Sequence, residues 1–289
     1  MTERRTWRFS DGVLLMGLVA LAIAATWSIW EDIFLGYALR DQEQSHILLA
    51  PFVALWLAWV RRGRTRYVRP RWTIAGAVVV AAGWMSAWYG LNSQHEIFWH
   101  FGALSMVVGA ALTIAGMDLM RYFGPAVVAL IFLLPIPGLI RQEISLPLQQ
   151  ITASVTQFLL EVFGQPVSRA GNVLTINGRE VAVAEACNGM RMVAALVLVS
   201  YAFIFSVPMR QEVRLFILAI SPLVAIVCNV IRLLPTTLLY GFAEPETADL
   251  FHDISGWVML PIALAMLWGV FVVLRWIEVP IAPYAVVEE

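Results

Sequence analysis

Residues Leu215–Leu234 have the sequence LFILAISPLVAIVCNVIRLL, in which Arg232 is the one charged side chain. An α-helix needs about 20 predominantly apolar residues to cross the hydrocarbon core of a bilayer, and this stretch is long enough to do so. Because lipid offers no hydrogen-bond partner to backbone N–H and C=O groups, a spanning segment is expected to be helical. The stretch therefore predicts a transmembrane helix with a guanidinium group inside it.

The rest of the chain has the same apolar character. Of its 289 residues, 60% are hydrophobic and 13% are charged, and its mean hydropathy is +0.77. A soluble domain carries about 25% charged residues. We therefore expect an all-α polytopic membrane protein, folded as one integral-membrane domain over residues 1–289. The net charge of −1 gives no sign of a nucleic-acid partner.

Apolar runs of sufficient length predict about eight transmembrane helices. The expected spans are 12–30, 46–60, 73–91, 98–116, 123–140, 190–206, 213–240 and 254–276. The first span follows a basic segment, as the apolar part of a signal peptide would. Its apolar run continues to Trp30, which favours a retained helix.

The arginines predict the orientation of these spans. All 19 basic residues are arginine, and if the N-terminus is cytoplasmic, 13 of them fall on the cytoplasmic side and six on the outer side. Cytoplasmic loops of membrane proteins carry an excess of basic residues, and the loop 61–72 makes the largest contribution here. Both termini are therefore expected in the cytoplasm.

This orientation brings three chemically active side chains to the outer face. Cys187 directly precedes the sixth span, Arg232 lies in the outer part of the seventh, and His252 lies in the outer loop before the eighth. A thiol, a guanidinium and an imidazole are the parts that cysteine-based acyl transfer needs. The sequence predicts that they converge in one outward-facing pocket.

The longest non-spanning stretch, residues 141–189, is expected to form an outer-face insertion that leads to Cys187. Its first part predicts an amphipathic helix on the outer leaflet, with Pro147 near its start. The apolar residues that recur there at helical spacing are Leu146, Leu148, Ile151, Val155, Phe158, Leu159 and Val162. Further on, Asn177-Gly178 between two β-prone runs predicts a β-hairpin. The helix after the hairpin would present its positive N-terminal end to the thiol, which favours thiolate.

Cys187 and Arg232 each have a plainer interpretation. A cysteine is often a small buried apolar residue, and Arg232 could be a structural ion-pair partner of Glu185 or Asp253. A guanidinium inside a span is costly, however, and such residues usually face the protein interior at functional sites. Cys228, the other cysteine, lies within an apolar run and is expected to serve packing alone.

All four histidines fall on the outer side in the predicted topology. They are His46, His95, His100 and His252. Imidazole is a good zinc ligand, so a metal site stays open as an alternative. The spacings match no compact metal motif, and we expect neither a metal nor another cofactor.

Several short motifs occur in an order that resembles one known family. Glu185–Arg191 matches the pattern acid-Ala-Cys-Ser-Gly-hydrophobic-Arg, with Asn188 in place of serine. Asn229–Arg232 matches an Asn-x-x-Arg run, and His252 matches a histidine at the entrance of the following helix. In these motifs the chain resembles the exosortase/archaeosortase family of membrane-embedded cysteine transpeptidases.

Two upstream features extend the resemblance over most of the chain. Ser45-His46 before Leu49-Ala50-Pro51 resembles an early Ser-His…Pro feature of the family. The segment 132–137 (FLLPIP), followed by 146–149 (LPLQ), resembles its mid-chain proline-rich part. The ordered combination is more specific than any single motif.

The resemblance implies an activity and a set of site residues. Cys187 would attack the scissile carbonyl, His252 would accept and return the proton, and Arg232 would stabilise the oxyanion. Residues expected to bind substrate or to support these three are Glu185, Asn188, Arg191, Asn229 and His46. The partners implied are exported proteins with a C-terminal sorting signal of the PEP-CTERM type, which consists of a short motif, often Pro-Glu-Pro, then a transmembrane helix and a basic tail.

The same resemblance implies a location and an accessory reaction. The protein would lie in the bacterial inner membrane with its active site facing the periplasm, and would transfer its substrates to an unidentified amine or envelope acceptor. Many such systems accompany exopolysaccharide production.

Three other functions stay open at this point. A transporter or channel would explain a charge within a span, although no repeat symmetry is evident. A non-catalytic assembly factor for exopolysaccharide export would leave Cys187 incidental, and a metal-dependent intramembrane protease would use the histidines. The lack of lysine excludes Schiff-base chemistry and a Ser/Lys dyad.

Overall fold

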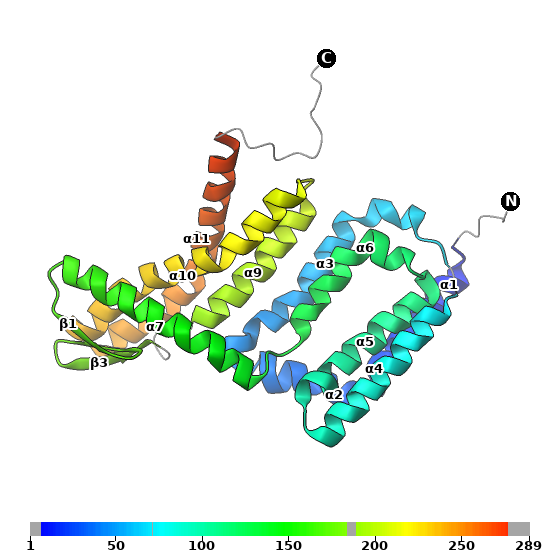
Figure 1. Cartoon of the computed structure of the whole chain (residues 1–289), viewed down its shortest axis with the longest axis horizontal. Helices are drawn as coiled ribbons and strands as arrows, with labels where there is room; N and C mark the ends of the chain where they lie inside the picture. Colours follow the sequence, from blue (N-terminus) through cyan, green and yellow to red (C-terminus); the bar gives the residue numbers. More distant parts are fainter. Residues whose placement is uncertain (1–6, 71, 184–188, 277–289) are drawn as a thin grey trace, which may run out of the picture. The chain divides into compact units, whose positions relative to one another are not determined.

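The computed structural model describes residues 7–70, 72–183 and 189–276, and it is mostly helical with one small sheet (Figure 1). The chain divides into two compact units, Met1–Pro137 and Gly138–Glu289. We call them the N-terminal unit and the C-terminal unit. A mostly helical fold agrees with the all-α expectation.

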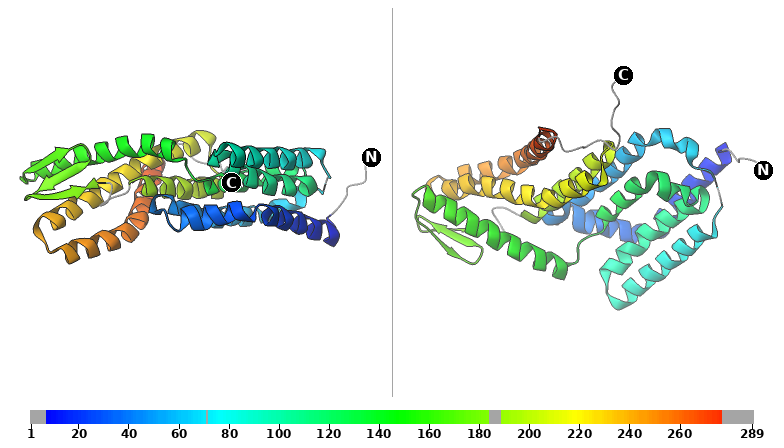
Figure 2. Two further views of the ribbon diagram at one scale, coloured as in Figure 1. Left: turned by 90° about the horizontal axis from the view of Figure 1, so that it is seen from below. Right: turned by 45° about the horizontal axis from the view of Figure 1, so that its top comes forward.

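The N-terminal unit consists of helices, several of them short. They are α1 (Phe9–Ala25), α2 (Trp27–Glu31), the π-helix η1 (Asp32–Ala38), the 3-10 helix η2 (Gln42–Leu49), α3 (Ala50–Val60), η3 (Arg62–Tyr67), α4 (Ile74–Ser93), α5 (Glu96–Ala115), α6 (Asp118–Ala129) and η4 (Leu130–Leu133). Helices α4 and α5 lie side by side along their length (Figure 2). Glycines permit this approach, because a Cβ at Gly76 or Gly90 would lie 2.3 Å from a backbone nitrogen of the other helix.

The span expected at 123–140 is wrong as a continuous helix. Helical structure ends at Leu133, and no helix covers 134–137. Pro135 and Pro137 explain the break, because proline lacks the N–H that a helix requires. The backbone N–H of Ile136 instead donates to Oε1 of Gln44 at 2.8 Å. That contact joins the two upstream motifs of the family resemblance, since Gln44 directly precedes Ser45-His46.

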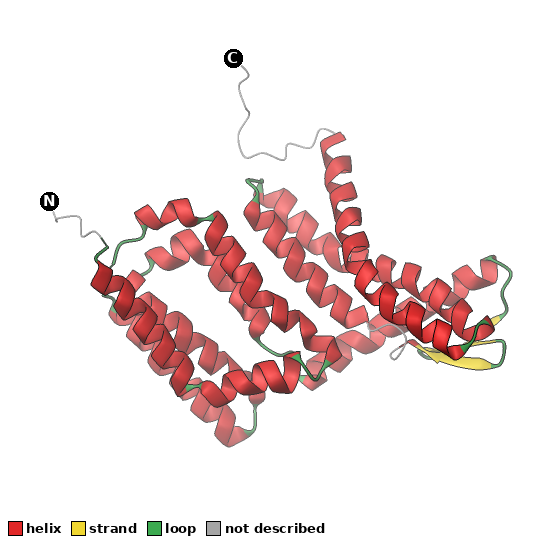
Figure 3. Cartoon of the chain, turned by 180° about the vertical axis from the view of Figure 1, so that it is seen from behind, coloured by secondary structure: helices red, strands yellow, loops and turns green. Residues whose placement is uncertain are grey.

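The C-terminal unit combines four long helices with a three-stranded antiparallel sheet. Its elements are α7 (Gly138–Val162), β1 (Val167–Ala170), β2 (Val173–Ile176), β3 (Arg179–Ala182), α9 (Gly189–Ser206), α10 (Gln211–Phe242) and α11 (Pro245–Trp276). The strands follow one another in the order β1-β2-β3 (Figure 3). The helix predicted before the hairpin is confirmed, but it starts at Gly138, so Pro147 lies inside it rather than near its start.

The predicted hairpin is confirmed, and it is larger by one strand. Asn177 and Gly178 have φ angles of 52° and 73°, the left-handed values that an Asn-Gly turn of type I′ requires. Strand β1 pairs with β2 from Val167 to Ala170 and was not predicted. Its sequence, Val-Ser-Arg-Ala, has two polar residues in succession, so it lacks the apolar–polar alternation that would predict a strand.

The sheet packs against α7 and α10 and is tied to the end of α10. Buried residues of all three strands, and Val183 directly after β3, form one apolar cluster with residues of these two helices: Ala153, Leu160, Val167, Leu174, Ile176, Val181, Val183 and Leu233. Arg179 donates to the carbonyl oxygens of Tyr240 at 3.1 Å and Ala243 at 2.8 Å. Asn177 donates to the carbonyl of Gly241 at 3.1 Å. These bonds satisfy carbonyls that the end of a helix leaves without partners.

The number of membrane spans is only partly determined. In the described part of the chain, four helical segments are long and apolar enough to cross a membrane: Glu43–Val60, Ile74–Ser93, Glu96–Ala115 and Gln211–Phe242. Up to seven spans result if each of three bent helix pairs counts as one. Met190–Ser206 is a shorter apolar helix at the predicted sixth span. The number eight therefore stays a prediction.

Helix α11 corrects the expected position of His252. The residue was expected in an outer loop, but α11 begins at Pro245 and already includes it. Proline fits the first turn of a helix, where its missing N–H is not needed, and Glu246 adds an acidic charge favoured there. His252 therefore has a position fixed by helical backbone.

Candidate active site

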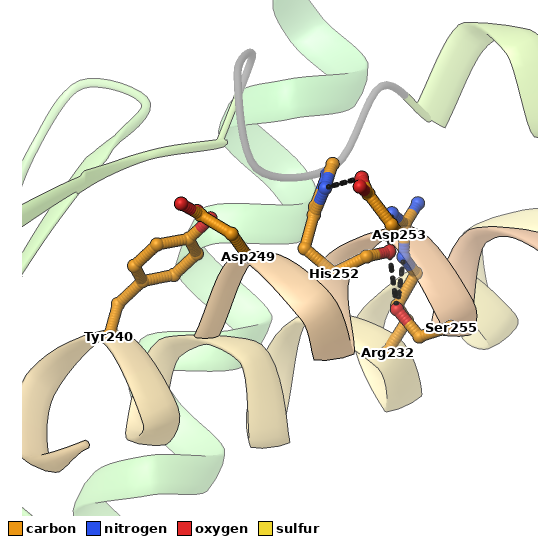
Figure 4. Close-up of polar contacts among 6 residues, drawn as sticks. All are labelled: Arg232, Tyr240, Asp249, His252, Asp253 and Ser255. Atoms are coloured by element: carbon orange, nitrogen blue, oxygen red, sulfur yellow. Dashed lines mark hydrogen bonds and ion pairs between the residues drawn. The ribbon is translucent and has the colours of Figure 1, made fainter. Parts of the chain in front are cut away.

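Arg232 is buried in the C-terminal unit and bonded to the neighbouring helix. Its side chain extends from α10, and the residue is 4% exposed. Nε donates to Oγ of Ser255 at 3.0 Å and Nη2 donates to the carbonyl oxygen of His252 at 3.0 Å (Figure 4). Ser255 Oγ in turn donates to the same carbonyl at 2.9 Å. This network fixes the guanidinium against α11, so a charge in an apolar run faces the protein interior as expected.

The side chain of His252 bonds to Asp253. The distance from Nδ1 to Oδ1 is 3.2 Å, and the imidazole is 26% exposed (Figure 4). A carboxylate only accepts, so a neutral His252 donates from Nδ1 and keeps Nε2 free of a proton. Such a nitrogen can accept a proton from a nucleophile.

The structure overturns one of the two ion-pair partners left open for Arg232. Asp253 bonds to His252, and Arg232 has no ion pair with any carboxylate in the residues that the structure describes. The preceding acid of α11, Asp249, accepts a hydrogen bond from the hydroxyl of Tyr240 at 2.7 Å. Arg232 itself bonds to two uncharged groups, the Ser255 hydroxyl and the His252 carbonyl.

Arg191 brings a second guanidinium to the same place. It lies in the first turn of α9, and a Cβ built on Gly256 of α11 would lie 3.5 Å from its Nη2. The same Cβ would lie 3.3 Å from Nη2 of Arg232. Because Gly256 has no side chain, both guanidinium groups can approach the backbone of α11 at this residue.

Asn229 lies one turn before Arg232 on α10 and is 1% exposed. Its Oδ1 has no hydrogen-bond partner among the described residues. A buried oxygen left in this state costs about 1–3 kcal/mol. Side chains three residues apart share a helix face, so the motif Asn-x-x-Arg places an unused acceptor beside the guanidinium.

Three predicted site residues, Glu185, Cys187 and Asn188, lie outside the described residues. The residues on either side of this segment belong to regular structure or bond to it. The backbone N–H of Val183 donates to the carbonyl of Asn172 at 2.9 Å, and α9 begins at Gly189. The structure brings Arg232 to the backbone carbonyl of His252, and the convergence of Cys187, Arg232 and His252 in one pocket stays a prediction.

His46 belongs to the N-terminal unit, where it is buried within η2 and 3% exposed. Its Nδ1 has no hydrogen-bond partner among the residues described. Its role in binding or support stays a prediction.

The other histidines have partners of their own. His100 bonds to Asp32 at 2.9 Å through Nε2, and its ring meets Tyr37 edge to face. His95 stacks on Phe98. Within the ranges that the structure covers, no group of three or more His, Cys, Asp and Glu side chains is placed to hold a metal ion.

Cys228 is a packing residue, as predicted. It is 0% exposed and belongs to an apolar cluster between α9, α10 and α11, with its sulfur 3.3 Å from that of Met266.

Sequence reasoning missed Ser255 and Gly256. Ser255 orients Arg232, and Gly256 provides the space that two arginines share. The available signal was a Ser-Gly pair following His252-Asp253 by one residue. The spacing of three and four residues from His252 has meaning only in a helix, whereas the sequence predicts a loop at this position.

Comparison with protein families identifies the family of this chain. The family model of the transmembrane exosortases matches residues 27–269, which is most of the chain. No curated protein and no solved structure matches. The matched region includes Arg191, Arg232 and His252 together with the segment that carries Cys187. The chain belongs to the transmembrane exosortase family.

Proposed function

We propose that this protein is a cysteine transpeptidase that cleaves the C-terminal sorting signals of exported proteins and transfers the new carboxyl end to an acceptor. The observation that carries the proposal is the contact of Arg232 with the His252 backbone in a chain of the exosortase family. Cys187 stands two residues before α9, and Arg191 in the first turn of that helix already lies against α11. Sequence connectivity thus supports a thiol close to the arginine and the histidine.

The first half of the reaction forms a thioester. Nε2 of His252 accepts the thiol proton, and the sulfur of Cys187 bonds to the scissile carbonyl carbon. The negative charge on the carbonyl oxygen is stabilised by N–H groups of Arg232 that do not bond to Ser255 or His252. The C–N bond then breaks, and His252 returns its proton to the leaving amine.

The second half releases the product. An amine of the acceptor, or water, loses a proton to His252 and attacks the thioester carbon. The C–S bond breaks and Cys187 recovers its proton, so the enzyme ends as it began. Asp253 keeps Nδ1 of His252 in the donating role throughout.

The cellular setting is part of the proposal. The enzyme would lie in a bacterial inner membrane with both termini in the cytoplasm and the site toward the periplasm, as the arginine distribution predicts. The sorting signal's own helix would pack laterally against the enzyme in the bilayer. The basic tail of the substrate would then stay on the cytoplasmic side.

A covalent intermediate provides the test. Membranes containing the enzyme and a substrate protein are quenched in acid, and the enzyme's peptides are analysed by mass spectrometry. We expect a substrate fragment bound to Cys187 that hydroxylamine releases, as it does a thioester. A fragment bound to any other side chain would contradict the proposal.

A further inference from the structure

The N-terminal unit has an apolar groove beside its basic segment. The groove has a volume of about 580 Å³ and is lined by residues of α1, η3, α5 and α6 and by residues next to α1 and η3. Its apolar lining consists of Trp7, Leu15, Val68, Ala115, Leu119 and Phe123. Among the lining residues that the structure describes, Arg66 is the charged one, and it is exposed. An apolar cleft with a cation at its edge fits a ligand that joins an apolar chain to an anionic head.

The basic segment gathers positive charge at this groove. Its exposed arginines, in η3 or directly after it, are Arg62, Arg64, Arg66 and Arg69. Within the part of the chain that the structure describes, the side chains of these four form no ion pair with a carboxylate. Asp118 of α6 accepts from the backbone N–H of Arg69, at 3.4 Å. Neighbouring cations repel one another, so an anion bound from outside the chain would stabilise the segment.

Aromatic rings hold two of these arginines and leave their donors available. The guanidinium carbon of Arg66 lies 4.8 Å from the centre of the Tyr67 ring, which stacks on Tyr122 of α6. Arg62 lies in the same way over Trp59, at 4.3 Å. Such contacts use the face of the guanidinium plane, whereas its N–H groups point outward within that plane. Arg66 can therefore donate in parallel to two oxygens of a phosphate.

Exposed aromatic residues indicate that the groove lies at the membrane surface. Trp59, Tyr67 and Trp72 are exposed around the basic segment, and tryptophan and tyrosine are enriched where a bilayer meets water. Trp7 donates from Nε1 to the carbonyl oxygen of Val68 at 2.7 Å, which joins the residues before α1 to those after η3. The predicted orientation puts this end of the unit at the cytoplasmic leaflet, where anionic lipids make the surface negative.

We infer that this groove binds one anionic phospholipid, with an acyl chain along the apolar lining and the phosphate on Arg66. The other arginines of the segment add attraction for a head group of net negative charge. A zwitterionic lipid has the same chain and phosphate, but its ammonium group opposes that attraction. A soluble phosphate ester has no chain to pack against Leu15, Leu119 and Phe123. The inference does not depend on the reaction proposed above.

The test measures lipid binding to the full-length enzyme in detergent. Phosphatidylglycerol and phosphatidylcholine with identical acyl chains are titrated separately, and native mass spectrometry gives the fraction of enzyme with bound lipid. We expect phosphatidylglycerol to bind about tenfold more tightly than phosphatidylcholine, the factor that corresponds to one charge-assisted contact. Glycerol phosphate, an anion without chains, should not displace it.

Two pairs of variants locate the bound lipid. Arg66→Gln should weaken binding of phosphatidylglycerol by about tenfold and leave that of phosphatidylcholine unchanged. Arg275→Gln, which alters an exposed arginine in the last turn of α11, should affect neither lipid. Leu15→Trp should prevent binding by filling the groove, whereas Met16→Trp, at the next and more exposed position of α1, should not.

Equal affinities for the two lipids would overturn the inference, as would displacement of phosphatidylglycerol by glycerol phosphate. The site would then select for the chain alone or for the charge alone. Native affinity in Arg66→Gln, or equal effects of Leu15→Trp and Met16→Trp, would overturn it as well. Thermal unfolding checks the fold of each variant. Should Leu15→Trp fail to fold, Arg66→Gln decides the outcome, because it alters an exposed residue.

Discussion

At the residue scale, the candidate site depends on a position that has no side chain. Gly256 lets Arg191 and Arg232 approach the backbone of α11, and an added methyl group would lie closer to Arg232 than such contacts normally allow. Arg232 has little freedom to retreat, because two hydrogen bonds hold it to Ser255 and to the carbonyl of His252. A small side chain at Gly256 should therefore displace Arg232 and lower the rate of the reaction.

We predict that Gly256→Ala lowers the rate of substrate processing by about tenfold, because small displacements of catalytic groups have effects of this order. Gly269→Ala is the matched control on the same helix, since a Cβ there meets nothing within 4 Å. Rates are measured by the loss of uncleaved reporter in membranes at equal enzyme levels. Equal rates for the two variants would show that the space at Gly256 is irrelevant.

At the element scale, the sheet fixes the end of α10 from which the chain turns into α11. Arg179 holds the carbonyls of Tyr240 and Ala243, and the hairpin turn contributes a bond from Asn177 to Gly241. The turn between the two helices determines how Arg232 meets His252. The hairpin therefore supports the site indirectly, by holding the end of α10 in place, and not through direct contact with the site residues.

Replacing Arg179 by Gln is expected to lower the free energy of unfolding by about 1–2 kcal/mol, because two charge-assisted bonds to helix carbonyls are lost at an exposed position. Thermal unfolding in detergent measures the change. Glu180→Gln, which alters an exposed residue of the same strand β3, should leave the midpoint close to that of the native protein. Equal midpoints of thermal unfolding for the two variants would show that the bonds from Arg179 to the end of α10 do not stabilise the protein.

At the scale of the whole molecule, the positive-inside rule predicts which side of the membrane each connecting segment faces. The structure gives the bounds of these segments. The basic segment Arg62–Tyr67 should face the cytoplasm, and the connection between α10 and α11 should face outward. That connection is the two-residue turn Ala243-Glu244, not the longer loop that the sequence predicted. Reporter fusions at these two places should give opposite signals, and equal signals would refute the shared outer face.

The sequence predicted features that depend on local chemistry. The apolar run around Arg232 predicted α10, and Asn177-Gly178 predicted the hairpin, because both signals lie in neighbouring residues. Contacts between residues that are far apart in the sequence could not be predicted in this way. The bond from Arg232 to Ser255 joins two helices, and His252 was misplaced because its polar neighbours resemble a loop.

The central claim is that Cys187 is the nucleophile that cleaves the substrate. The chain has a second cysteine, Cys228, which serves as the control. Purified enzyme is reconstituted in liposomes with a substrate protein, and cleavage is followed over time for Cys187→Ala and Cys228→Ser. The account predicts no cleavage by the first variant. It predicts a nearly native rate for the second, whose sulfur is buried in an apolar cluster. Cleavage at the native rate by Cys187→Ala would contradict the account.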